Sequence, residues 1–326
     1  MSNHWYGRWG QVTARQQGFN LIELMISMLL GLLVVGAAIG IFLSNRQTYA
    51  ATEGLGRVQE TARIGFEMLA RDIRESGANP CDKALPVANV LTSPTATWWK
   101  NWVQPLQGFE NGVLSGSASG TDAIQILAAA TGGATLSTHA AASQQITLSA
   151  TAPEIQSGNL ALLCDRQQLA ILQLQTVSGT SVSYVSASLN TCNRLGRLPG
   201  VCVTGSNAYT YERNAILTNL RAVRWYVKAN SRGSSSLYQD VIGSGGTSVT
   251  NEIAEGVSDM ELEYLTAAGG ALADANYVNA AAITNWANVL AVRLSLTVQS
   301  PDSVGSDGQP LSRTVTSVIS IRNRNS

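Results

Sequence analysis

An unbroken run of 20 residues without a charge lies close to the amino terminus, from Leu24 to Leu43. As an α-helix this run would be about 30 Å long, which matches the hydrocarbon core of a lipid bilayer. A helix that is apolar on every side can also be a buried core helix, but the rest of the chain would then have to surround it. The sequence therefore predicts a helix that spans a membrane.

The charges on either side of this run predict its orientation. Arg8 and Arg15 precede it, and no acidic residue lies among the first 22 residues. Because basic residues next to a membrane span stay on the cytoplasmic side, we expect a cytoplasmic amino terminus and a main body outside the cytoplasm. Ser44–Ala51 contains no A-x-A arrangement. An ordinary signal peptide that is cut after the apolar run is therefore not expected.

A short motif, Gln17–Glu23 (QGFNLIE), lies directly before the run. It resembles the class III signal of type IV prepilins and of the pseudopilins of type II secretion, with Asn20 where the family often has Thr. The resemblance implies that a prepilin peptidase cuts between Gly18 and Phe19 and then methylates the new amine of Phe19. Residues 1–18 would then be a cytoplasmic leader peptide that is removed.

Glu23 is the single carboxylate of this apolar segment. A charge inside a membrane helix costs a few kcal/mol, and it is kept where a partner neutralises it. Cleavage after Gly18 would create an amine on Phe19, four residues before Glu23 and on the same helix face. The amine of a neighbouring subunit could meet the same carboxylate, which gives Glu23 a role in assembly. The alternative is that the side chain of Glu23 reaches the lipid headgroups.

Helical periodicity continues beyond the membrane run. Apolar residues recur at steps of three and four, and they are Leu55, Val58, Ala62, Phe66, Leu69 and Ile73. The sequence predicts one long helix with a transmembrane half, 19–43, and an amphipathic half, 44–76. Gly77 and Pro80 are expected to end it.

The remainder of the chain, residues 77–326, is predicted to form a β-rich head. The expected strands include a hairpin and two later strands, and they lie at Asn159–Leu163, Ala222–Lys228, Leu237–Ile242, Asn288–Gln299 and Arg313–Ile321. Residues 83–159 are instead expected to be a variable, loop-rich insertion with one strand at Ala123–Leu127. The fold class is therefore α+β, with a long amino-terminal helix packed on a predominantly antiparallel β head.

Two further segments resemble one family. Met68–Gly77 and Glu252–Tyr264 are similar to the stalk end and the head of PilW-type minor pilins of the type IV pilus. Strands like Val223–Lys228 and Val289–Val298 precede and follow the second segment in that family, in the order found here. The expected fold is therefore pilin-like.

The resemblance implies a subunit that helps to initiate pilus assembly and sits at or near the pilus tip. Its implied partners are the prepilin peptidase, other minor pilins, the major pilin and a tip adhesin. Its implied location is the inner membrane, with a periplasmic head, and then the pilus. A J-type pseudopilin of type II secretion shares the signal and the helix, and it stays open as an alternative. A DNA-uptake minor pilin is a second alternative, for which Arg322 and Arg324 are slight support.

The composition argues against most other functions. The 21 basic residues balance 21 acidic residues, so nucleic acid is not an expected main partner. His4 and His139 are the two histidines, and no nucleotide-binding, zinc-protease or hydrolase motif occurs. We expect no catalytic residues, no metal, no cofactor and no small-molecule substrate. A membrane-anchored enzyme built around His139 is the remote alternative.

Two groups of residues have both a structural and a functional interpretation. Trp98, Trp99 and Trp102 could form a platform for a sugar or a single strand, but core or subunit-interface positions are more common. The later acidic residues favour a solvated face over a binding site, and they are Glu252, Glu255, Asp259, Glu261 and Glu263.

The four cysteines fit two disulfides in an oxidising compartment. Three pairings are open to four cysteines. The segment between Cys192 and Cys202 contains two glycines and a proline, which let the chain reverse and bring the two cysteines together. We therefore expect a Cys192–Cys202 disulfide, which leaves Cys81 to pair with Cys164.

Overall fold

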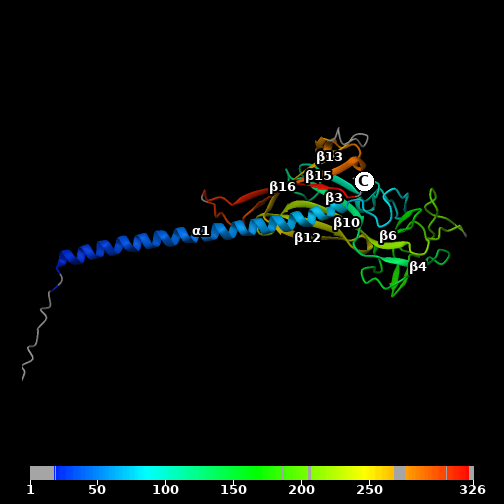
Figure 1. The fold of residues 1–326 in the computed structure, drawn as a ribbon, viewed down its shortest axis with the longest axis horizontal. Coiled ribbons are helices and arrows are strands. Elements are labelled where there is room, and N and C mark those ends of the chain that lie inside the picture. The colour runs from blue at the N-terminus through cyan, green and yellow to red at the C-terminus, as the bar shows by residue number, and fades with distance from the viewer. Residues whose placement is uncertain are drawn as a thin grey trace, which may run out of the picture. The chain divides into compact units, whose positions relative to one another are not determined.

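The fold is described from a computed structural model, in which residues 18, 20–185, 187–204, 207–267, 276–305 and 307–322 are described. One long helix, α1, runs from Leu21 to Glu75 (Figure 1). The chain divides into two units, residues up to Glu53 and residues from Gly54 onward, and α1 contributes to both. The prediction of one long helix is confirmed.

The first part of α1 is exposed throughout. Every residue from Leu21 to Tyr49 is exposed, and the helix includes a stretch that is long and apolar enough to cross a membrane. Leu, Ile, Val, Met and Phe dominate this stretch, and the described part of the chain leaves their side chains exposed. Length and composition therefore agree with the predicted membrane span.

The second part of α1 is amphipathic and packs on the head. Its buried face consists of Gly54, Val58, Ala62, Gly65, Leu69, Ala70, Asp72 and Ile73. The helix ends at Glu75, and Gly77 adopts a φ of +70°, a left-handed conformation that glycine takes without a steric cost. The backbone N–H of Gly77 then donates to the carbonyl of Leu127, 2.8 Å away. Gly77 is thus the predicted stop.

The head contains a twelve-stranded sheet. Its strands are β1 (Val87–Asn89), β2 (Leu106–Phe109), β3 (Ala123–Ala129), β4 (Ala134–Ala140), β5 (Gln145–Leu148), β6 (Leu160–Cys164), β7 (Leu169–Gln173), β8 (Thr176–Ser178), β9 (Ser181–Ser183), β10 (Ile216–Ala229), β11 (Ser235–Ile242) and β12 (Ser248–Glu255). The main path is β1-β7-β6-β10-β4-β5-β9-β8, while β3 and β11 also pair with β10, β2 pairs with β3, and β12 pairs with β11. The long strand β10 is therefore the centre of this sheet.

A second sheet has four strands, β13 (Val257–Thr266), β14 (Asn276–Val278), β15 (Val289–Gln299) and β16 (Ser312–Ser320). They lie in the order β14-β13-β15-β16, and all three pairs are antiparallel. The predicted alternation in β15 is present, because Val292, Leu294, Leu296 and Val298 are fully buried. Short 3₁₀ helices complete the described elements: η1 (Trp98–Lys100), η2 (Ser244–Gly246), η5 (Ala280–Ala282) and η6 (Trp286–Asn288).

The largest hydrophobic core joins the second part of α1 to both sheets. It contains Leu69 and Ile73 of α1, Trp225 of β10 and Leu296 of β15, among others. The close approach depends on Gly65, where an added β-carbon would lie 3.2 Å from the side chain of Leu237. A separate core lies among β4 to β9. The second part of α1 therefore belongs to the folded core of the head.

Residues 83–159 contain five short strands, β1 to β5, with loops between them. The strand expected at Ala123–Leu127 lies within β3, which pairs directly with β10, whereas the other four were not expected. In β4, the buried residues Leu136 and His139 are three positions apart because a register shift interrupts the strand between Leu136 and Thr138. A β-bulge of this kind removes the two-residue period by which a strand is recognised.

The structure favours the core interpretation of the tryptophans Trp98, Trp99 and Trp102. Trp99 is buried, and Trp98 and Trp102 pack against the same hydrophobic cluster. The guanidinium of Arg224 covers the ring of Trp98, with 4.3 Å between its central carbon and the ring centre. These tryptophan side chains thus make packing and cation–π contacts within the chain.

Candidate functional site: the long helix and its junction with the head

The residues of the predicted processing signal lie at the beginning of α1. Gly18 is exposed, and an added β-carbon there would meet nothing within 4 Å. Phe19 lies outside the described residues. Glu23 is exposed in the first turn of α1, its backbone N–H donates to the carbonyl of Asn20, and its carbonyl accepts from the hydroxyl of Ser27. No ion pair of the described residues includes Glu23, so its partner stays an expectation.

A buried carboxylate joins α1 to the head. Asp72 is 5% exposed and accepts hydrogen bonds from three side chains of the twelve-stranded sheet. The guanidinium of Arg221 is bidentate, with distances of 3.0 Å from Nη2 to each carboxylate oxygen. Trp225 Nε1 donates to Oδ2 at 2.8 Å, and Gln239 Nε2 donates to the same oxygen at 2.9 Å. We name these four residues the junction.

The sequence positions of the junction residues follow from strand geometry. Arg221 and Trp225 are four residues apart on β10 and therefore lie on the same face. Gln239 of β11 is the direct cross-strand partner of Trp225. The twelve-stranded sheet thus presents three donors at one place, where the buried face of α1 carries Asp72. A buried ion pair is costly to break, because removal of one partner leaves a desolvated charge.

The sequence analysis missed the junction, although one signal was present. Asp72 stands three residues after Leu69 and next to Ile73, inside the apolar stripe of the helix. A carboxylate at a core-facing position requires a partner. The sequence does not identify the partner of Asp72, because Arg221 is 149 positions away in the chain.

Two disulfides fasten the head. Cys81 is bonded to Cys164 with 6.3 Å between their α-carbons, and Cys192 is bonded to Cys202 with 5.9 Å. These are the two pairs expected from the sequence. Cys81 follows the end of α1 by six residues, and Cys164 is the last residue of β6. The first disulfide therefore ties the segment after the helix to the twelve-stranded sheet.

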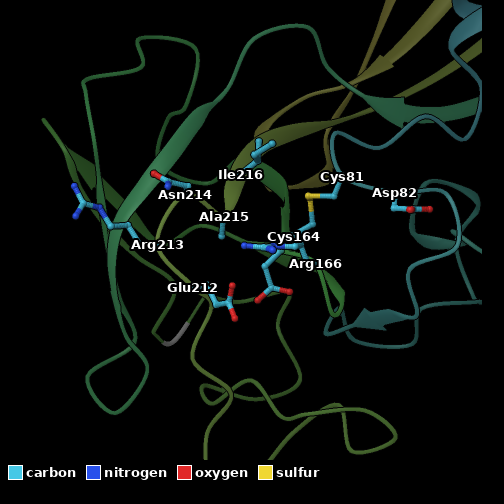
Figure 2. A pocket seen from close by; sticks show the side chains of 10 residues that line it. Cys81, Asp82, Cys164, Arg166, Glu212, Arg213, Asn214, Ala215 and Ile216 are labelled. Atoms are coloured by element: carbon cyan, nitrogen blue, oxygen red, sulfur yellow. A yellow bond between two sulfur atoms is a disulfide. The ribbon is translucent and has the colours of Figure 1, made fainter.

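An open pocket of about 540 Å³ lies beside the Cys81–Cys164 disulfide. Its charged lining residues have both signs and are Asp82, Asp165, Arg166, Glu212 and Arg213 (Figure 2). Asp165 is engaged in the fold, because its Oδ2 accepts from the hydroxyl of Tyr209 at 2.6 Å and its Oδ1 accepts from two backbone N–H groups. The pocket has no strong charge preference.

His139 is a structural residue. Its Nδ1 accepts from the backbone N–H of Tyr211 at 3.0 Å, and its Nε2 lies 2.9 Å from the hydroxyl of Tyr184. Burial lowers the pKa of His139 to about 4, so the ring is neutral at physiological pH. With Nδ1 as an acceptor, the neutral ring carries its proton on Nε2 and donates it to Tyr184. Both nitrogens are occupied in holding β4 to neighbouring segments.

The acidic residues of β12 and β13 fall into two groups. Glu252 and Glu255 form ion pairs with Arg232, and Glu263 pairs with Arg293 at 2.8 Å. Asp259 and Glu261 have no such partner among the described ion pairs. In the described part of the chain, no group of three His, Cys, Asp or Glu side chains could hold a metal ion.

Comparison with known proteins adds one match. The model of the family described as type IV pilus-assembly protein W (PilW) matches residues 224–323. This range covers the end of β10 from Arg224 onward and all of β11 to β16, and it includes Trp225 and Gln239 of the junction. No curated protein and no solved structure matches the chain. Together with the long apolar helix and the β-rich head, this match makes the chain similar to PilW-type type IV pilus proteins.

Proposed function

We propose that the protein is a minor pilin that helps to initiate type IV pilus assembly and sits at or near the pilus tip with other minor pilins. The observation that carries this proposal is the PilW match in the head, on a chain whose helix is fully exposed and apolar over its membrane-length part. An apolar surface of this length needs either lipid or other helices around it. A subunit that moves from the membrane into a helical filament would be surrounded first by lipid and then by the helices of other subunits.

The proposal includes the partners that the processing signal implies. The prepilin peptidase would cut before Phe19 in the inner membrane, and the major pilin, the other minor pilins and a tip adhesin would join the protein in the filament. The role is structural rather than catalytic, in agreement with the use of both His139 nitrogens inside the fold. The two disulfides support a head that folds in an oxidising compartment, which in this proposal is the periplasm.

The processing step gives one prediction. Replacing Gly18 by Val should block cleavage, because a β-branched residue is bulky where the signal has glycine. N-terminal mass spectrometry of the wild-type protein should find a methylated Phe19, whereas the G18V protein should keep its leader. Mature protein that begins at Met1 or after Leu43 would contradict the proposal.

The assembly function is tested in cells that lack the gene for this chain. We expect the loss of surface pili, and their return when the full chain is supplied, with the protein found in sheared pili. Secretion of a type II reporter enzyme is measured in the same strains. Normal piliation together with lost secretion would assign the protein to the type II pseudopilus instead. The variant E67Q, at an exposed ion pair with Arg63, is the matched control that should restore piliation.

A further inference from the structure

The last strand of the four-stranded sheet, β16, has one unpaired edge. It pairs with β15 over nine residues without a register shift, and no other described strand pairs with it. At one end of this pairing, the backbone N–H of Ser300 donates to the carbonyl of Leu311, and at the other end that of Ile321 donates to β15. By the alternation of an antiparallel pair, the odd-numbered residues of β16 bond to β15, and the even-numbered residues turn their N–H and carbonyl groups away. The even-numbered residues are Ser312, Thr314, Thr316, Val318 and Ser320.

This edge is exposed, and its own sheet holds it in place. Seven of the nine residues of β16 are exposed. The hydroxyl of Thr316 lies 2.8 Å from that of Ser295, and a second pair of hydroxyls joins Thr314 to Thr297 at 2.9 Å. Val318 is 51% exposed, although its side chain is apolar. A further strand at this edge would cover Val318 as a cross-strand neighbour.

The other edge strands in the described part of the head lack these properties. β1, β8 and β14 have three residues each, and β2 has four. β12 has eight residues, but its pairing with β11 contains a register shift, and it carries Glu252 and Glu255. Short, irregular and charged edges hinder the addition of a strand. β16 is longer and regular, contains no proline, and has Arg313 as its one charged residue.

β16 runs beside the second part of α1 and in the same direction (Figure 1). Leu311, just before the strand, lies near Gly54, where an added β-carbon would be 3.8 Å from its side chain. Just after the strand, the backbone N–H of Arg322 donates to the carbonyl of Arg74 at 3.0 Å. In the proposed function, the neighbours of this subunit lie along its helix, so their heads come close to β16.

The edge also indicates the chemistry of its partner. Outward N–H and carbonyl groups at a two-residue period match the backbone of an extended segment. Antiparallel pairing with the β16 of a second copy would point the two α1 helices in opposite directions, which does not suit two subunits anchored in one membrane. Parallel pairing in register would bring two like charges together at Arg313. Arg313 is exposed, and no ion pair of the described residues includes it.

We propose that the unpaired edge of β16 binds an extended β-strand of a different protein subunit, which places an acidic residue opposite Arg313. The inference rests on the proposed function for the assignment of that subunit to the pilus. Strand pairing is measured separately from piliation, so the two proposals can fail separately.

The test is photo-crosslinking in living cells that make the full-length chain. Val318→p-benzoylphenylalanine places a photoreactive group at the edge of β16. Val249→p-benzoylphenylalanine is the matched control, because Val249 is 53% exposed on β12, the irregular and charged edge. Ultraviolet light should join position 318 to another pilus subunit, which peptide mass spectrometry identifies, and position 249 should not give this product.

A substitution in the same strand shows whether the main chain holds the partner. Thr316→Pro removes an outward N–H and no bond to β15, a position where edge strands accept proline. Thr316→Val keeps this N–H, and both variants lose the hydroxyl contact with Ser295. T316P should lower the yield of the product at position 318 about tenfold, and T316V less than about twofold. Thermal unfolding of the purified variants checks that they fold.

Charge gives a comparison that leaves the backbone unchanged. R313E should lower the yield about fivefold, and R313K less than about twofold. Absence of a product at position 318 would overturn the proposal, as would equal yields within either pair of variants. A product with a second copy of this chain would overturn the assignment to a different subunit. A product with a protein outside the pilus, lost in T316P, would support strand addition and contradict the proposed function.

Discussion

At the scale of single residues, we expect substitution of Asp72 to have the largest effect on stability. Its carboxylate is buried and accepts from Arg221, Trp225 and Gln239, so that one helix residue satisfies donors on two strands. Its removal would leave two buried N–H donors and one guanidinium without their acceptor. Such groups keep the full cost of their desolvation.

The first prediction is that D72A lowers the free energy of unfolding by about 3 kcal/mol or more. The matched control is E67A on the same helix, which breaks an exposed ion pair and should cost less than about 1 kcal/mol. Urea unfolding of the full chain in detergent, followed by tryptophan fluorescence, measures both. Equal effects of the two substitutions would show that the junction does not stabilise the head.

The second prediction concerns pH and His139. The pKa of His139 is about 4 in the folded protein and about 6.5 when unfolded, so the unfolded chain binds the proton first as the pH falls. The neutral ring of His139 therefore contributes fully to the free energy of unfolding above pH 6.5. As the pH falls from 6.5 to 4, about 2 to 3 kcal/mol of this contribution is lost.

The measurement compares wild type with H139Q at pH 7 and at pH 4.5. The stability advantage of the wild type should shrink at the lower pH, because glutamine has no proton to bind. The comparison between variants is needed since Glu110, Asp122 and Glu261 have raised pKa values, which act in the opposite direction. A constant difference between the two proteins would contradict the role assigned to His139.

At the scale of elements, the two disulfides differ in the length of chain that each one closes. Cys81–Cys164 joins residues 83 positions apart and ties the segment after α1 to β6, whereas Cys192–Cys202 closes a separation of 10. In the chain-entropy model, the longer loop restricts the unfolded chain more.

The third prediction follows from this difference. The double variant C81A/C164A should lose about 4 kcal/mol of unfolding free energy, against about 3 kcal/mol for C192A/C202A. It should also reduce the amount of protein in cells more strongly. Peptide mapping without reduction should find the two pairs in the wild type. A link between Cys81 and either Cys192 or Cys202 would contradict this account.

At the scale of the whole molecule, the apolar part of α1 is exposed in the described structure, and an apolar surface of this length needs lipid or other helices as its surroundings. In the proposed function these are first lipid and then the helices of other pilus subunits. Glu23 is the acidic residue of the first turn of α1, and in the proposed function its charge is matched by the amine of an adjacent subunit.

The fourth prediction is that E23A stays inserted in the membrane but is poorly recruited to the assembling pilus. Insertion should not suffer, because the substitution removes a charge from the span. Co-purification of the other minor pilins with wild type and variant measures recruitment, and membrane fractionation measures insertion. Equal co-purification would show that Glu23 has no part in assembly.

The sequence by itself determined the features that depend on neighbouring residues. An apolar run of membrane length and a three-to-four-residue period specify α1, a two-residue period specifies β15, and glycine at position 77 specifies the helix end. Local patterns of this kind need no knowledge of the rest of the fold. The same reasoning missed β4, because the bulge in that strand interrupts the two-residue period.

Only the tertiary structure decided what depends on distant residues. The partners of Asp72 lie on β10 and β11, and no local pattern links them to α1. Asp122 likewise lies against β13 through hydrogen bonds with Met260 and Leu262, although the sequence separates them by more than 130 residues. Along the chain, Asp259 and Glu261 belong to one acidic run that favours a solvated face. Packing of the two sheets separates that run into ion-paired residues and residues without a cation. Charge pairing is a property of three-dimensional neighbours, and the order of residues alone does not contain it.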